Sequence, residues 1–146
     1  MADKITLNDK VFRVMIPAEQ IEAAVDRVAA SLNERYAGRT PIFLGVLSGS
    51  FLFLSDLVRK TTFDSQISFV KISSYQGTES TGEVKQQLGV DFDIEGRDII
   101  IVEDIIETGH SMNYLLDYLR SKNPASITIC TLFFKPDKFL YEYDVD

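Results

Sequence analysis

Four apolar runs, each of strand length, most constrain how this chain can fold. They cover residues 42–47, 66–74, 98–102 and 126–134. Their content of β-branched and aromatic residues predicts strands. The apolar residues in them are nearly continuous rather than alternating with polar ones. That pattern is typical of strands that are covered on both faces of a sheet.

Segments of helical periodicity alternate with these predicted strands. Residues 17–36 carry Ile21, Val25, Val28 and Leu32 at helical spacing with charges between them, and residues 51–60 and 111–122 are also predicted helices. Strands that alternate with helices predict an α/β fold with a mainly parallel, twisted sheet and helices on both faces. With 146 residues and no linker or repeat, we expect one domain over residues 1–146.

Residues 75–96 do not fit this alternation. They are polar, carry several glycines and show weak periodicity. A long irregular stretch inside a compact domain is often a functional lid or a flexible hairpin, and both interpretations stay open here.

Charge and special residues exclude several classes of function. The net charge of -7 argues against non-specific binding to nucleic acid or to an anionic membrane. The single cysteine, Cys130, lies in an apolar run, so we expect a buried, inert thiol and no disulfide within the chain. The single histidine, His110, does not suit a zinc site. The chain shows no signal peptide and no membrane-spanning stretch, so we expect a cytoplasmic protein without membrane contact.

The most informative motif follows the predicted strand 98–102. Two adjacent carboxylates, Glu103 and Asp104, would repel each other without a cation or hydroxyl donors, and a ribose diol with Mg²⁺ nearby is such a partner. Thr108, Gly109 and Ser111 then lead into a helix, where hydroxyls and unpaired N–H groups form a phosphate pocket. A ribose 5-phosphate would bridge the two parts. In the plainer interpretation, Ser111 is only an N-cap and the two carboxylates are solvated.

The sequence here resembles a known family. Residues 99–109 are similar to the phosphoribosyl pyrophosphate motif of type I phosphoribosyltransferases, and the Ile105-Ile106 spacer is the form usual in the hypoxanthine-guanine branch. Residues 46–51 resemble the family's pyrophosphate loop, and residues 74–75 followed by 80–82 resemble its mobile catalytic loop. Residues 132–135 resemble the strand with the base-recognising lysine. The resemblance spans residues 7–146 and implies the type I phosphoribosyltransferase fold, which is Rossmann-like.

The resemblance also implies roles for the site residues. Glu103 and Asp104 would hold the ribose hydroxyls and the associated Mg²⁺, and the 5-phosphate would lie against Glu107, Thr108, Gly109, His110 and Ser111. Ser48 and Gly49 would present backbone N–H groups to pyrophosphate through a strained or cis peptide. An ordinary strand-to-helix turn is the alternative for residues 48–50.

Three further roles concern the lid and the base. Ser74 and Tyr75 would close over the pyrophosphate, and Lys135 would bind the oxygen on purine C6. Glu107 would be the catalytic group, acting on a purine nitrogen as a general base or hydrogen-bond acceptor. The family usually has aspartate at that position, and a lysine is common where His110 stands.

The resemblance bears on the end of the chain too. The family continues past Asp146 into a further strand and a small hood, which supply an aromatic residue stacked on the purine and another metal-associated aspartate. We therefore expect a domain that lacks this strand and has an incomplete hood, either as a fragment or as a chain with an incomplete base pocket.

Three functions remain open. The leading prediction is a purine salvage enzyme that joins phosphoribosyl pyrophosphate and a 6-oxopurine, hypoxanthine or guanine, and releases pyrophosphate. The second is a regulatory module that senses phosphoribosyl pyrophosphate or nucleotide without turnover. The third is a related transferase that prefers xanthine. The family implies a homo-oligomer, a dimer or a tetramer.

Overall fold

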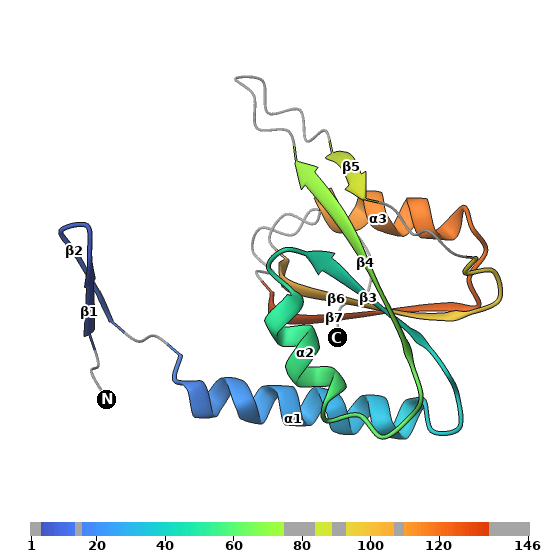
Figure 1. Cartoon of the computed structure of the whole chain (residues 1–146), viewed down its shortest axis with the longest axis horizontal. Helices are drawn as coiled ribbons and strands as arrows, with labels where there is room; N and C mark the ends of the chain where they lie inside the picture. Colours follow the sequence, from blue (N-terminus) through green and yellow to red (C-terminus); the bar gives the residue numbers. More distant parts are fainter. Residues whose placement is uncertain (1–3, 14–15, 75–83, 89–92, 107–109, 135–146) are drawn as a thin grey trace.

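The computed structural model describes residues 4–13, 16–74, 84–88, 93–106 and 110–134. Figure 1 shows helices packed on both sides of one central sheet, with a separate two-stranded hairpin at the N-terminus. The elements, in chain order, are β1 Lys4–Leu7, β2 Lys10–Arg13, α1 Ala18–Arg35, β3 Ile42–Leu47, α2 Phe51–Val58, β4 Gln66–Ser74, β5 Val84–Leu88, β6 Asp98–Ile106, α3 His110–Arg120 and β7 Ser126–Phe134.

The central sheet has the strand order β5-β4-β3-β6-β7. Strands β4, β3, β6 and β7 are parallel to one another, and β5 is antiparallel to β4. This confirms the predicted α/β fold with a mainly parallel sheet. From β3 the chain adds β4 on one side and then returns to place β6 on the other side. The strand order therefore reverses between β3 and β6, and such a switch point opens a binding crevice at the carboxyl ends of the strands.

Two hydrophobic cores lie on opposite faces of this sheet. On one face, Leu44 and Ile101 pack with residues of α3, such as Leu115. On the other face, Phe43 and Ile100 pack with residues of α1 and α2. Neighbouring residues of one strand thus enter different cores, which explains why the strands are continuous apolar runs. Cys130 is buried in the second core, as expected.

Two features differ from the sequence-based expectations, and a third agrees with one of them. The hairpin of β1 and β2 was not predicted, although its turn residues Asn8 and Asp9 have positive φ angles of 49° and 64°, the conformation that two-residue hairpin turns need. Strand β6 continues to Ile106, so Glu103 and Asp104 lie within the strand and not after it. Strand β5 forms a hairpin with β4, which agrees with the hairpin interpretation of residues 75–96 for the described residues 84–88.

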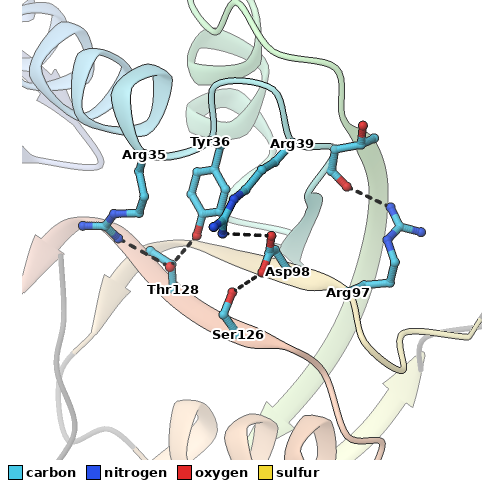
Figure 2. Close-up of polar contacts among 8 residues, drawn as sticks. Arg35, Tyr36, Arg39, Arg97, Asp98, Ser126 and Thr128 are labelled. Carbon is cyan, nitrogen blue, oxygen red and sulfur yellow. Dashed lines mark hydrogen bonds and ion pairs between the residues drawn. The ribbon is translucent and has the colours of Figure 1, made fainter.

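Polar side chains are bonded to one another at the edge where the parallel strands begin (Figure 2). Tyr36 and Thr128 share a buried hydrogen bond of 2.7 Å between their hydroxyl oxygens. Ser126 Oγ donates to Asp98 Oδ1 at 2.6 Å, and Arg39 forms an ion pair with Asp98 at 3.5 Å. We call this set of side chains the amino edge.

No described helix is long and apolar enough to cross a membrane.

Candidate active site at the carboxyl edge

The predicted site residues that the structure describes lie at the opposite edge, where the parallel strands end. The loop of residues 48–50 follows β3, and residues 107–109 follow β6, its neighbour in the sheet. We call this region the carboxyl edge. Ser74 is the last residue of β4 and lies at the same edge. Five predicted site residues lie outside the described residues: Tyr75, Glu107, Thr108, Gly109 and Lys135.

The loop after β3 has an unusual backbone. The peptide bond between Leu47 and Ser48 is cis, as the resemblance implied. Ser48 and Gly49 are exposed, and their N–H groups donate no hydrogen bond to any other residue that the structure describes. Backbone N–H groups that face solvent without a protein partner are suited to bind an anion.

Glu103 and Asp104 are the charged groups of the site. The Asp104 N–H donates to Glu103 Oε1 at 3.0 Å, and the Ile105 N–H donates to Asp104 Oδ1 at 2.8 Å. Burial, together with a side-chain hydrogen bond and repulsion from Asp104, raises the pKa of Glu103 to about 8. Within the described part of the chain, no lysine or arginine forms an ion pair with either carboxylate.

Gly49 brings the two parts of the site together. A methyl group placed on its Cα would lie 2.8 Å from Cγ of Asp104, closer than real side-chain carbons approach. Only a glycine therefore allows this loop to lie against the carboxylate without a shift. An anion held by the N–H groups of the loop would be a direct neighbour of whatever Asp104 binds.

The region after β6 is described in part. His110 and Ser111 are the first two residues of α3. Because the helix begins before Ser111, this serine lies in the first turn and is not the N-cap of the plainer interpretation. Strand β7 ends at Phe134, which pairs with Ile106 at the end of β6. The ends of β6 and β7 therefore lie side by side at this edge.

The carboxylates suit the magnesium ion that the sequence predicts. Among the described residues, no group of three or more acidic, histidine or cysteine side chains could form a complete protein cage for a metal. Mg²⁺ is commonly held by one or two carboxylates together with water and substrate phosphates. Glu103 and Asp104, next to an anion-binding loop, fit that mode of binding.

One residue of this site was not singled out from the sequence. Ser50 is fully buried, and its Oγ donates to the Val46 carbonyl at 2.6 Å, across the loop that carries Ser48 and Gly49. The sequence offered only its place in the Ser48-Gly49-Ser50 turn, and a serine before a helix is ordinarily read as a cap.

Comparisons with known proteins agree with this geometry. The model of the phosphoribosyl transferase domain family matches residues 17–145. The chain therefore belongs to the phosphoribosyltransferase family.

Within that family, several similar proteins are named hypoxanthine or hypoxanthine-guanine phosphoribosyltransferase. A hypoxanthine-guanine phosphoribosyltransferase of Streptococcus agalactiae is 39% identical over 141 residues, which are 96% of this chain and 78% of the relative. A hypoxanthine phosphoribosyltransferase of Staphylococcus aureus has a similar structure, with a TM-score of 0.85 and 34% identity over 91% of this chain and 73% of that one. A hypoxanthine-guanine phosphoribosyltransferase of Bacillus anthracis, solved with HEPES in its active site, gives a TM-score of 0.84 and 32% identity over 92% of this chain and 78% of that one.

Proposed function

We propose that this protein transfers the 5-phosphoribosyl group from phosphoribosyl pyrophosphate to hypoxanthine or guanine, a reaction of purine salvage. The observation that supports the proposal is the contact between Gly49 and Asp104, because the loop proposed to bind pyrophosphate then lies next to the carboxylate proposed to hold ribose. Phosphoribosyl pyrophosphate needs these two groups next to each other, because its diphosphate is attached to C1′ of the ribose ring.

In the proposed reaction, a purine nitrogen attacks C1′ while the bond from C1′ to the pyrophosphate oxygen breaks. The products are inosine or guanosine monophosphate and pyrophosphate. Positive charge develops on the sugar and negative charge on the leaving group. The protein therefore acts mainly by aligning the reactants and by stabilising charge.

The groups of the site divide the binding of the substrate among them in this scheme. Glu103 and Asp104 bind the ribose hydroxyls, and the Ser48 and Gly49 N–H groups bind the leaving pyrophosphate. Magnesium, held by Glu103 and Asp104 together with substrate oxygens, would neutralise the charge on the diphosphate. The 5-phosphate would lie at the start of α3, near His110 and Ser111, where helix N–H groups favour an anion.

The remaining roles fall on residues outside the described ranges. We propose that Glu107 accepts the proton that the purine nitrogen loses, that Thr108 and Gly109 complete the phosphate pocket, and that Lys135 binds the oxygen on purine C6. Tyr75, with Ser74 at the end of β4, would cover the pyrophosphate. We further propose a homodimer or tetramer in the cytoplasm, on the basis of the family alone.

A spectrophotometric assay tests the proposal. The protein would be incubated with phosphoribosyl pyrophosphate, Mg²⁺ and, in separate reactions, hypoxanthine, guanine, xanthine or adenine. We expect nucleotide formation with hypoxanthine or guanine. Turnover with xanthine alone would assign a different transferase. Binding of phosphoribosyl pyrophosphate without any turnover would favour the regulatory module, and absence of both would contradict the proposal.

A further inference from the structure

Ser50 occupies the N-cap position of α2, but its side chain does not cap the helix. A serine at this position usually has an extended backbone and accepts a hydrogen bond from an N–H group in the first helical turn. Here the backbone of Ser50 is already helical, with φ -83° and ψ -10°. The Leu54 N–H donates to the Ser50 carbonyl at 2.8 Å, so the backbone of Ser50 belongs to the helix while its hydroxyl is directed elsewhere.

The hydroxyl points back to the strand that precedes the loop. Ser50 Oγ donates to the Val46 carbonyl at 2.6 Å, and the Ser50 N–H approaches the same carbonyl at 3.4 Å. Ser50 is fully buried, which strengthens a hydrogen bond and makes its loss costly. Ser50, at the end of the loop, is thus bonded through both its hydroxyl and its N–H group to Val46, at the start of the loop.

The closed segment carries the functional loop. It contains Ser48 and Gly49, which are exposed, and Gly49 lies against Asp104. A turn contact from the Phe51 N–H to the Ser48 carbonyl, at 3.4 Å, is long. Among the described hydrogen bonds within residues 46–51, the hydroxyl bond of Ser50 is therefore the shortest, and it fixes the loop against the end of β3.

We propose that Ser50 is a positioning residue for the pyrophosphate loop. Its bond to Val46 holds the Ser48 and Gly49 N–H groups at the place where a diphosphate next to Asp104 needs them. Ser50 is buried beneath the loop and does not itself touch the substrate. This inference rests on the proposed function and deepens it, because it assigns the geometry of the loop to a residue outside the binding groups.

The inference predicts that loss of the Ser50 hydroxyl affects the binding of ligands with a diphosphate and not the binding of a ligand without one. Without the hydroxyl, the loop keeps only the longer contacts, and its N–H groups lose their fixed direction. Binding of phosphoribosyl pyrophosphate and of pyrophosphate should weaken. Inosine monophosphate has the same ribose and 5-phosphate but no diphosphate, so its binding should stay the same.

Calorimetric titrations with Mg²⁺ would measure the dissociation constants of the three ligands for the wild type and for Ser50→Ala. We expect Ser50→Ala to weaken phosphoribosyl pyrophosphate and pyrophosphate by about tenfold, the value of one hydrogen bond of ordinary strength. Ser50→Cys keeps the volume with a much weaker donor and should give a similar loss. Inosine monophosphate should bind both variants as it binds the wild type.

Two control variants separate positioning from general damage. Ser55→Ala removes an exposed hydroxyl from the same helix and should change nothing. Thr128→Val removes a buried, hydrogen-bonded hydroxyl at the amino edge, and should lower the melting temperature without changing any of the three affinities.

Two results would overturn the role of Ser50. One is wild-type affinity of both Ser50 variants for the diphosphate ligands, and the other is an equal loss for inosine monophosphate. If the wild type binds none of the three ligands, the proposed function fails, and the inference fails with it.

Discussion

The two edges of the sheet use polar residues in opposite ways. At the amino edge, Asp98 is bonded to Arg39 and Ser126, and Tyr36 is bonded to Thr128 (Figure 2). These groups satisfy one another across α1, β6 and β7. They need nothing from outside the protein, and they fix the packing of these elements.

At the carboxyl edge, the carboxylates have few partners among the residues that the structure describes. Glu103 and Asp104 accept hydrogen bonds from neighbouring backbone N–H groups of their own strand, and no described lysine or arginine pairs with them. Strand β6 carries acidic residues at both of its ends. The two edges therefore differ in the partners of these acidic residues and not in the residue type. Adjacent acidic groups that no described lysine or arginine neutralises are typical of a site that a ligand completes.

The largest predicted effect comes from removing both carboxylates of the carboxyl edge. Glu103→Gln with Asp104→Asn should weaken phosphoribosyl pyrophosphate by about 100-fold or more, because two charge-assisted interactions with the ligand and its metal are lost. Calorimetric titration measures this loss, and circular dichroism checks that the fold is kept.

The matched control for that double variant is Asp98→Asn, which alters an acidic residue at the other end of the same strand. We expect this change to lower the free energy of unfolding by about 1 kcal/mol and to leave ligand affinity unchanged. If the double variant binds as the wild type does, or if Asp98→Asn weakens binding equally, the division between the two edges is wrong.

The next largest effect on binding is expected at Gly49, and Gly38 serves as its control. Gly49→Ala would place a methyl group against the Asp104 carboxylate, so the loop must shift, and phosphoribosyl pyrophosphate should bind about tenfold more weakly. Gly38 has a φ of 76° and nothing within 4 Å of an added methyl group. Gly38→Ala should therefore cost about 1 kcal/mol of stability through backbone strain, with no change in binding. Titration and denaturant unfolding of both variants measure these effects, and the reverse pattern would contradict the assignment.

A smaller effect is expected from the amino edge alone. Tyr36→Phe removes one hydroxyl of the buried pair with Thr128, whose oxygen keeps a long contact of 3.5 Å with Arg35. We expect a loss of about 1 kcal/mol in the free energy of unfolding, with kcat and KM unchanged. A change in KM for phosphoribosyl pyrophosphate would mean that the amino edge influences the site.

A further prediction concerns how stability depends on pH. Burial raises the pKa of Glu103 to about 8, so the folded state holds a proton that the unfolded chain releases near pH 4.5. The folded state therefore gains most from this group below about pH 4.5, and the gain is lost as the pH rises towards 8. The slope is at most about 1.4 kcal/mol per pH unit, and solvent screening at this partly exposed group reduces it.

Denaturant unfolding at several values between pH 5 and pH 8, in buffer without magnesium, tests this expectation. The stability of Glu103→Gln should decline less steeply over that range than the stability of the wild type. Parallel curves for the two proteins would show that Glu103 does not hold the proton.

The sequence predicted most of the fold because its signals are local. Apolar runs and helical spacing identified β3, β4, β6, β7 and the three helices within a few residues. The predicted end of β6 was wrong because Glu103 and Asp104 look like loop residues, whereas the pairing of Glu103, Ile105 and Ile106 with β7 continues the strand through them. The N-terminal hairpin was not predicted because its strands have four residues each, although Asn8 and Asp9 are a usable turn signal.

The site was predictable in its parts but not in its assembly. Glu103 and Asp104 attract attention as adjacent carboxylates, and Gly49 as part of a turn. The contact between Gly49 and Asp104 depends on β3 and β6 being neighbours, which no local pattern encodes. The direction of the Ser50 hydroxyl could not be predicted either. A serine at an N-cap has the same sequence pattern whether its hydroxyl bonds to the first turn of the helix or to the strand before it.

The most direct test of the division between the edges is a nuclear magnetic resonance titration of the wild type with phosphoribosyl pyrophosphate and Mg²⁺. If the carboxyl edge is the binding site, the backbone amide signals of Ser48, Gly49, Glu103 and Asp104 should shift, while those of Asp98, Ser126 and Thr128 should stay in place. Shifts confined to the amino edge, or no shift at saturating ligand, would contradict the account.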